Sequence, residues 1–357
     1  MCTPKIIRLT VSDTCTFVSR AVMLAMVVAV GGCDPAPTPV SAPAPEKSPV
    51  AVAADSDGQA SAIEMAIDTT LAPSVDSLVD STLDQRINAA GELISAMPIE
   101  FPDDDAIRFL AWNIESEGAN ADTIADQIMS LPRYDIYGFS EVRPQDFATI
   151  RDRLGDAYAC RYSKSGYNDR LAYAIRKDRF QIVNQLELKE FESHKLNPGN
   201  YRSPYITEVK DNRTGRELTL VLNHLARGKA EIRQAQAAGL SAWAASLGDT
   251  PLIAIGDYNF DYVFATDKGN VAFDVFLKDD VFKWVRPSPM VDSNWFDGNG
   301  DGIDDYPGSL LDFVFVGGEA KAWESQCRVL VREDDFPDNK ITSDHRPVEF
   351  TILPKSN

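Results

Sequence analysis

Residues 252–259 have the sequence Leu-Ile-Ala-Ile-Gly-Asp-Tyr-Asn, an apolar run that stops abruptly at an acidic and an amide side chain. Continuous apolar runs of this length are typical of β-strands that are buried on both faces or packed in a sandwich. The stretch therefore predicts a buried strand with Asp257 and Asn259 at its end.

Five more stretches have the same form, in which a short apolar run carries a polar side chain that can bind a metal ion or a phosphate group. They are residues 107–115, 135–141, 218–224, 310–316 and 342–350. A single Asn or Asp at such a position is ordinarily a turn residue or faces solvent. Because the pattern recurs along the chain, with helical stretches such as 229–247 in between, we expect a layered α/β fold with the polar side chains gathered at one edge.

A pocket built from these stretches would contain Asp, Glu, Asn and His side chains. Oxygen-rich sites of this kind suit a hard divalent cation such as Mg²⁺, which takes one or two carboxylates from a protein and keeps most of its waters. The chain has 3 histidines, and His224 and His345 both fall inside the stretches. The third, His194, lies in a polar segment without a motif, and we expect it at the surface.

Composition narrows the class of protein further. The 54 acidic residues outnumber the 35 basic ones to give a net charge of −19, which argues against a broad basic face for nucleic acid but leaves a local basic groove open. With 44% hydrophobic residues and 17 Phe, the chain can bury a substantial core. Its 5 cysteines form no close C-x-x-C pair, which excludes a zinc ribbon or a thioredoxin-type site.

The first residues have the pattern of an export signal. Three basic residues precede the apolar run 21–30, which is far shorter than the ~20 residues of a membrane span, so residues 1–32 are predicted to be a signal peptide. The run ends in Val-Gly-Gly-Cys at 30–33, which resembles the lipobox of bacterial lipoproteins, with Cys33 as the lipidated residue. An ordinary secretory signal with a free cysteine is the alternative. Either way we expect an extracytoplasmic protein, and lipidation would anchor it in a membrane, in the periplasm or at the cell surface.

Residues 33–100 are rich in Pro, Ala and Ser and nearly free of aromatic residues, so they predict a disordered tether. Weak helical periodicity near 75–97 predicts a helix there. From residue 101 to 357 the composition is that of one compact domain. This domain contains Cys160 and Cys327, and a disulfide between them stays open because sequence distance gives no geometric support.

Six motifs in this domain together resemble the endonuclease/exonuclease/phosphatase family. They are W-N-I-E at 112–115, S-E at 140–141, N-H-L at 223–225, G-D-Y-N at 256–259, L-D-F-V-F at 311–315 and S-D-H-R-P-V at 343–348. Their order and spacing agree with the family from about residue 107 to 350. The resemblance implies a four-layer, DNase I-like α/β sandwich, in which two mixed β-sheets face each other between outer helices and the site lies at one end of the sheets.

The resemblance also implies roles for the motif residues around a bound Mg²⁺ or Mn²⁺ ion. Glu141 resembles the principal metal ligand, with Asn113 beside it and Asp344 nearby. Asp257 resembles the residue that orients or deprotonates the attacking water, and Asn259 the one that holds a phosphate oxygen.

The two histidines resemble the imidazoles at the phosphate group. His345 would contact the phosphate and be oriented by Asp312, a pairing that favours the charged ring, and His224 would lie by the scissile phosphate. Arg202 resembles a family position near the phosphate, and Arg170 is a further candidate for a substrate contact. The alternative for both arginines is a plain surface position.

An acidic, glycine-rich segment precedes Asp312 and departs from the family pattern. Its oxygen-bearing side chains alternate with glycines, as in calcium-binding loops, and a structural Ca²⁺ would be held by Asp297, Asn299, Asp301 and Asp305. However, Ile303 comes one place early for an EF-hand, and no glutamate closes the loop. A solvated acidic surface loop is the alternative.

These observations predict an exported, divalent-metal-dependent phosphoester hydrolase that acts as a phosphodiesterase, of which a nuclease is one kind. Its substrate would be nucleic acid, a phospholipid head group or a soluble phosphate ester, because the motifs build only the shared phosphate site. No obligate protein partner is inferred. The alternative from another class is a membrane-tethered, calcium-binding scaffold that has kept the fold and lost catalysis.

Overall fold

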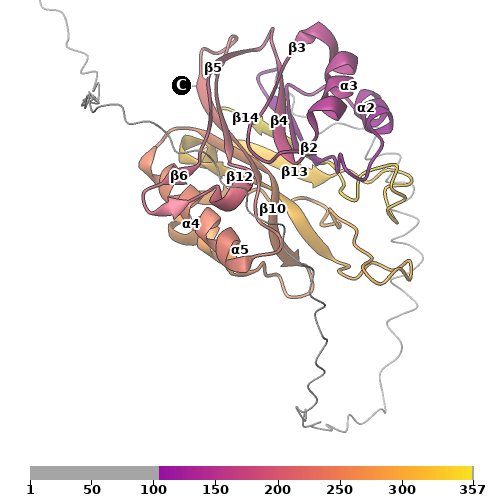
Figure 1. Ribbon diagram of the computed structural model, residues 1–357. Coiled ribbons are helices and arrows are strands. Elements are labelled where there is room, and N and C mark those ends of the chain that lie inside the picture. The colour runs from indigo at the N-terminus through magenta and orange to yellow at the C-terminus, as the bar shows by residue number, and fades with distance from the viewer. Residues whose placement is uncertain (1–103, 356–357) are drawn as a thin grey trace, which may run out of the picture. The chain divides into compact units, whose positions relative to one another are not determined.

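The computed structural model describes residues 104–355 as two six-stranded β-sheets with helices on their outer faces (Figure 1). This confirms the predicted sandwich of two mixed sheets for the described residues. The signal peptide at 1–32, the lipidation site Cys33, the tether at 33–100 and the helix near 75–97 lie outside them. Among the described helices, none is both long and apolar enough to cross a bilayer.

The first sheet has the strand order β13-β14-β1-β2-β4-β3, in which only β1 and β2 are parallel neighbours. Helices α2 and α3 pack against each other on its outer side (Figure 1). The elements are β1 (Ile107–Asn113), α2 (Ala121–Ser130), β2 (Ile136–Val142), α3 (Pro144–Leu154), η2 (Gly155–Ala157), β3 (Tyr158–Tyr162), β4 (Arg170–Arg176), β13 (Glu324–Val329) and β14 (Val348–Leu353).

The second sheet has the order β11-β12-β10-β9-β8-β5, in which only β9 and β10 are parallel neighbours. Helices α4 and α5 contact each other on its outer side, and the small β6–β7 hairpin packs on α4 (Figure 1). The elements are β5 (Phe180–Glu187), β6 (Glu190–Phe191), β7 (His194–Lys195), η3 (Pro198–Asn200), β8 (Tyr205–Asp211), β9 (Glu217–His224), α4 (Ala230–Ser246), β10 (Leu252–Val263), α5 (Val271–Leu277), η4 (Lys278–Asp280), β11 (Phe282–Trp284), β12 (Ser309–Gly317) and η5 (Gly318–Ala322).

Alternation along β1 explains the layers. Successive side chains of a strand point to opposite faces. Phe109 belongs to the core cluster that also contains Leu222 of β9, whereas Leu110 belongs to the cluster that contains Ile124 of α2 and Phe147 of α3. Strand β1 is therefore buried on both faces, which is why its sequence is a nearly continuous apolar run.

The parallel pair β1–β2 of the first sheet packs against the parallel pair β9–β10 of the second sheet at a glycine. Gly138 lies in the middle of β2, and a Cβ atom there would come within 2.7 Å of Ile255 Cδ1 and 3.1 Å of Leu222 Cδ1. Glycine at this position lets β2 approach β9 and β10 closely. The ends of the two pairs are thereby held near each other.

Short polar residues fix where the helices begin. The side chain of Asn120 accepts hydrogen bonds from the backbone of Asp122 and Thr123 and caps α2, and Asn270 caps α5 in the same way. Pro144 occupies the start of α3, where its missing N–H would have no partner in any case.

Both cysteines in the described residues are free thiols. Cys160 lies in β3 and Cys327 in β13, the two strands at opposite edges of the first sheet. The disulfide that the sequence left open is therefore not formed.

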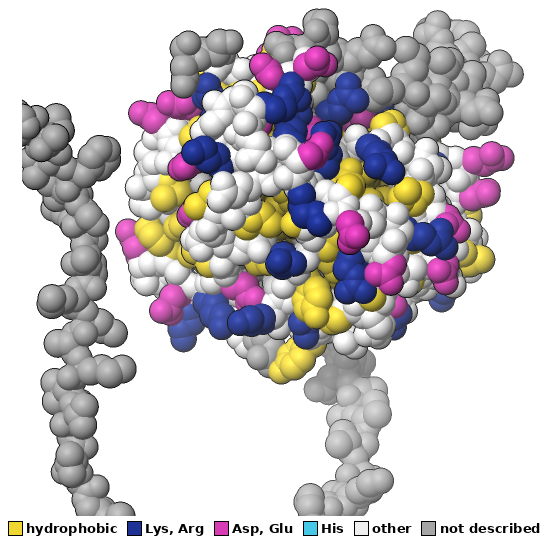
Figure 2. All heavy atoms as spheres, turned by 90° about the horizontal axis from the view of Figure 1, so that it is seen from above, with side chains coloured by type: hydrophobic (Ala, Val, Ile, Leu, Met, Phe, Trp, Pro, Cys, Tyr) yellow, Lys and Arg dark blue, Asp and Glu magenta, His cyan; other side chains and the backbone are white. Residues whose placement is uncertain are grey.

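The face in Figure 2 shows Lys and Arg side chains interspersed with Asp and Glu and with hydrophobic side chains. Basic residues on this face do not gather into one continuous band. This agrees with the charge composition, which argues against a broad basic face.

Strand β10 bends at the residues that end its apolar run. Gly256 has φ 126°, and a Cβ atom there would lie 2.2 Å from the carbonyl oxygen of Asn223 in β9. After Asp257 the pairing of β10 with β12 shifts register, and Asn259 has φ 51°. This bulge aims Asp257 and Asn259 at the edge of the sheet.

Replacing Gly256 with Ala is expected to destabilise the fold, because the backbone conformation and the contact with Asn223 both exclude a methyl group. We expect the free energy of unfolding to fall by about 3 kcal/mol. Gly248→Ala is the control, because Gly248 has φ 60° but open space around it, so only the conformational cost of ~1 kcal/mol applies. Urea unfolding of the full chain measures both, and equal losses would contradict the steric argument.

Candidate active site

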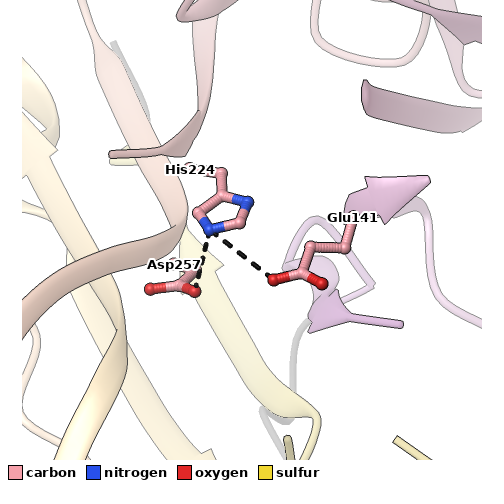
Figure 3. A group of neighbouring side chains, drawn as sticks. All are labelled: Glu141, His224 and Asp257. Atoms are coloured by element: carbon pink, nitrogen blue, oxygen red, sulfur yellow. Dashed lines mark ion pairs between the residues drawn. The ribbon is translucent and has the colours of Figure 1, made fainter. Parts of the chain in front are cut away.

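Residues from three neighbouring strands of the second sheet lie at one level. In the strand pairing, Asp257 of β10 faces His224 of β9 on one side and Asp312 of β12 on the other. The first sheet contributes Asn113 at the end of β1 and Glu141 near the end of β2. Figure 3 shows Glu141 facing His224 and Asp257 across the gap between the sheets.

Glu141, His224 and Asp257 form a group that could bind a metal ion. Each offers a ligand atom, and these atoms all lie within 4.8 Å of one another. The Nε2 atom of His224 is 3.4 Å from Oδ2 of Asp257 and 3.7 Å from Oε1 of Glu141 (Figure 3). Two carboxylates and an imidazole are ligands that divalent cations accept.

Asn113 connects the carboxylates of the two sheets. Its Nδ2 atom donates to Oε1 of Glu141 at 2.9 Å and to Oδ2 of Asp257 at 3.2 Å. Its Oδ1 atom accepts a hydrogen bond from the backbone N–H of Glu115 at 3.1 Å. Asn113 thus presents its amide nitrogen to Glu141, and it is almost completely buried.

Asp257 and Asn259 are fixed by each other and by the loop after β9. Oδ1 of Asp257 accepts the backbone N–H of Asn259 at 2.9 Å. The side chain of Asn259 donates to the carbonyl of Leu225 at 3.0 Å and accepts from Nη1 of Arg227 at 3.1 Å. Arg227 had no role predicted from sequence, because nothing in its neighbourhood marks it except the preceding N-H-L motif.

His345 is paired with Asp312 and faces Asp257. Its Nδ1 atom lies 2.7 Å from Oδ2 of Asp312, and its Nε2 atom lies 4.0 Å from Oδ2 of Asp257 and 3.9 Å from Oδ1 of Asp344. Burial alone would lower the pKa of His345, but the three carboxylates outweigh burial and hold the pKa well above its ordinary value. These carboxylates therefore favour the protonated form of the ring.

His224 has a carboxylate partner of its own. Its Nδ1 atom lies 3.1 Å from Oδ1 of Asp169, whose Oδ2 pairs with Nη1 of Arg202 at 2.9 Å. Burial and Arg202 lower the pKa of His224, but Asp169 and Asp257 together raise it above its ordinary value. The site therefore contains two imidazoles that each combine a carboxylate partner at Nδ1 with an Nε2 atom directed at Asp257.

Asp169 is a site residue that sequence reasoning missed. It immediately precedes Arg170, the residue chosen as a candidate from the same segment. The structure places the Arg170 guanidinium against the carbonyls of Tyr167 and Ser163 and over the Tyr162 ring at 5.2 Å. These contacts include none of the other candidate residues, whereas Arg202 is brought to the site through Asp169.

Asp344 and Glu115 add negative charge beside Glu141. The backbone N–H of Asp344 donates to Oε2 of Glu115 at 3.0 Å. Burial, followed by the charge of Asp344, raises the pKa of Glu115 to about 7, and burial raises the pKa of Asp344 to about 6, with Glu141 adding to the effect. A cation at this place would relieve the repulsion, so the donor set fits a divalent metal ion. Glu115 belongs to the W-N-I-E motif but had no role predicted from sequence.

The acidic segment before β12 folds into a compact loop. Asp297 accepts backbone hydrogen bonds from Gly300 at 2.6 Å and from Gly302 at 2.8 Å, and these bonds, that of Gly302 first, lower its pKa. Asp305 accepts from the backbone of Gly298 at 2.8 Å and from Nδ2 of Asn299 at 3.4 Å. Oδ1 of Asp301 accepts the backbone N–H of Ile303. These oxygens face groups of the loop itself, and the calcium site stays a prediction.

Comparison of sequences supports the resemblance found in the motifs. The sequence profile described as "Endonuclease/Exonuclease/phosphatase family" matches residues 110–345. No curated protein matches the chain.

Three solved structures with the same fold are 17% to 20% identical in sequence to this chain. One is an endonuclease/exonuclease/phosphatase family protein from Bacteroides thetaiotaomicron, with 20% identity, a TM-score of 0.54, and 70% of this chain and 98% of that chain covered. A second is the mannosyl-6-phosphatase Bt3783 of the same species, at 19% identity and a TM-score of 0.53 over 70% of this chain and 100% of that one. A third is D. rerio TDP2 in complex with a single-strand DNA product, at 17% identity and a TM-score of 0.55, covering 70% and 100%. At this identity the likeness demonstrates the fold.

Each histidine is expected to respond mainly to the carboxylate at its own Nδ1 atom, and both rings share Asp257 at Nε2. Asp312→Asn removes a negative charge from His345, so the pKa of His345 should fall while that of His224 stays near its wild-type value. Asp169→Asn should have the converse effect. The chain has 3 histidines, so ring signals followed by NMR against pH, and assigned with His345→Gln, resolve each site. If Asp312→Asn left the midpoint of His345 unchanged, the pairing would not be what charges the ring.

Proposed function

We propose that the chain is an exported phosphodiesterase in which Asp257 activates water. The proposal starts from the family: the chain belongs to the endonuclease/exonuclease/phosphatase family and is a metal-dependent phosphoester hydrolase. One observation carries the proposal. Oδ2 of Asp257 lies between the Nε2 atoms of His224 and His345, at 3.4 and 4.0 Å, and opposite Glu141. The carboxylate that would act as the base thus lies beside two imidazoles and a candidate metal ligand.

Asp257 would orient the attacking water and accept its proton as the new oxygen–phosphorus bond forms and the ester bond breaks. Negative charge grows on the equatorial phosphate oxygens during this step, and positioned cationic donors stabilise it. His345 would supply such a donor through Nε2, and His224 would lie by the scissile phosphate. Asp312 and Asp169 keep the rings oriented, and Asn259 would hold a phosphate oxygen.

We assign the metal site to Glu141 as principal ligand, with Asn113 and Asp344 beside it and with Asp257 and His224 within reach. The gathering of Glu115, Glu141 and Asp344 supports a cation here. Burial is the main cause of the raised pKa values of Glu115 and Asp344, and the neighbouring carboxylates add to it. When bound, Mg²⁺ or Mn²⁺ would act as a Lewis acid on the phosphate group. In the structure Asn113 turns its amide nitrogen to Glu141, so ligation through Oδ1 would require its amide to turn over.

The candidate substrates remain nucleic acid, a phospholipid head group and a soluble phosphate ester. Proteins of similar structure include a mannosyl-6-phosphatase and a TDP2 bound to single-strand DNA product, which supports sugar phosphates and nucleic acid among these classes. The net charge of −19 and the mixed charges on the face in Figure 2 argue against tight binding of long duplexes.

Hydrolysis by the full chain is expected to need a divalent metal ion and Asp257. With bis-p-nitrophenyl phosphate, p-nitrophenyl phosphate, plasmid DNA and sphingomyelin as substrates, chelator should abolish turnover. Asp257→Asn should lower the rate by about 10²–10⁴-fold, because the proton acceptor is lost. Glu141→Gln should raise the metal concentration needed by at least about 10-fold.

The exposed Asp274 of α5 gives the matched control, and Asp274→Asn should keep wild-type activity. Diesters should be preferred over monoesters. A folded protein without turnover on any substrate would contradict the enzyme and favour the calcium-binding scaffold.

Export and lipidation of Cys33 are the cellular part of the proposal, and the Val-Gly-Gly-Cys sequence at 30–33 supports it. In a bacterium that processes lipoproteins, labelled fatty acid should be incorporated into the full chain and the protein should sediment with membranes. Cys33→Ala should abolish both without lowering hydrolysis. Labelling that persists in Cys33→Ala would place the lipid elsewhere, and an unlabelled, exported wild-type chain would indicate an ordinary secretory signal.

A further inference from the structure

Two exposed aromatic side chains lie together in the loop between β11 and β12. Phe296 is 44% exposed and Tyr306 is 55% exposed, and their ring centroids are 5.9 Å apart at an angle of 33°. Large aromatic rings are usually buried, so an exposed pair that packs only partly on the protein marks a surface with a binding role. The metal site and the histidine pairs make no use of either ring.

Backbone hydrogen bonds tie this loop to the active site. The N–H of Trp295 donates to the carbonyl of Asp344 at 2.8 Å, and Asn294 forms an isolated antiparallel bridge with His345. Phe296 is the next residue along the chain. Its position is therefore set by the same segment that carries the phosphate-contacting imidazole.

Arg227 joins the aromatic pair to the phosphate-binding end of the site. Its Nη1 atom donates to Oδ1 of Asn259 at 3.1 Å, and its guanidinium carbon lies 5.9 Å from the centre of the Phe296 ring. One cationic group thus contacts both the residue assigned to a phosphate oxygen and the exposed aromatic surface.

The acidic loop holds the two rings in place. Oδ1 of Asp304 accepts the backbone N–H groups of Phe296 at 3.2 Å and of Tyr306 at 3.0 Å. The N–H of Asp305 donates to the carbonyl of Phe296 at 2.7 Å. The turn between the two aromatic residues is closed by the hydrogen bonds that Asp297 accepts from Gly300 and Gly302.

We propose that Phe296 and Tyr306, together with Arg227, form a platform on which a nucleobase of the substrate stacks next to the scissile phosphate. Aromatic faces and a guanidinium are the surfaces that bind unpaired bases. The positive charge of Arg227 disfavours a choline head group, which aromatic surfaces otherwise attract. This inference rests on the proposed function and narrows its substrate to nucleotide diesters in which the base is free to stack.

The kinetic test compares two substrates with the same leaving group, thymidine 5′-(p-nitrophenyl phosphate) and methyl p-nitrophenyl phosphate, on the full chain. The nucleoside ester should be preferred, and Phe296→Ala should lower kcat/KM for it on the order of 10-fold through KM, while the methyl ester is unaffected. Phe296→Trp should retain the preference. Ile303→Ala removes an exposed apolar side chain, 66% exposed, from the same loop and should change neither substrate.

A binding test separates the platform from catalysis. Calorimetry on the full chain should show thymidine 5′-monophosphate binding on the order of 10-fold more tightly than 2-deoxyribose 5-phosphate and phosphocholine. Phe296→Ala should remove this difference. Equal binding of the three ligands, or hydrolysis of both esters without preference, would overturn the platform and leave the hydrolase standing. Base-dependent binding without any hydrolysis would support the platform and contradict the proposed function.

Discussion

Carboxylates from two different sheets, Glu141, Asp257, Asp312 and Asp344, meet at one edge of the sandwich, where their mutual repulsion must be offset. The chain does this with Asn113, which donates to Glu141 and Asp257 at once, and with His345, which lies between three of the acids. Burial, and after it the neighbouring carboxylates, raises the pKa values of Glu115 and Asp344. Stability alone would not gather these charges, so the arrangement reflects chemistry.

The geometry of the backbone brings these charged side chains together. Gly138 allows the two parallel strand pairs to approach, and Gly256 allows β10 to press against β9 one residue before Asp257. The bulge that follows then turns Asn259 toward the loop of Arg227. A side chain at Gly256 would collide with the backbone of β9, and one at Gly138 would displace the side chains of Ile255 and Leu222 in the facing sheet. The packing of the sheets and the direction of the polar groups therefore depend on the same residues.

Much of the fold could be predicted from the sequence. Strands that are buried on both faces have uninterrupted apolar sequences, and several of these sequences end in one of the recognised motifs. The family and the sandwich of mixed sheets were predicted from these runs and motifs and are confirmed. The contacts that loop residues make could not be predicted from the sequence. Asp169 lies in the loop between β3 and β4 and reaches His224 at the end of β9 in the other sheet, a contact that no sequence spacing reveals. Its neighbour Arg170 packs on Tyr162 instead. Strand order also decides that Cys160 and Cys327 stay apart, and local sequence does not encode strand order.

Pairing between β1 and β14 has a consequence for how the molecule folds. These strands are neighbours although nearly the whole described chain separates them, and side chains on either side fix the seam: Ser343 Oγ donates to the carbonyl of Asn113 at 2.6 Å, and Trp112 Nε1 donates to that of His345 at 2.8 Å. Contacts between such distant segments form late and slowly, because the loop that joins them must first lose its entropy. The pocket is therefore complete only once β1 and β14 have paired, because Asn113 ends β1 and His345 precedes β14.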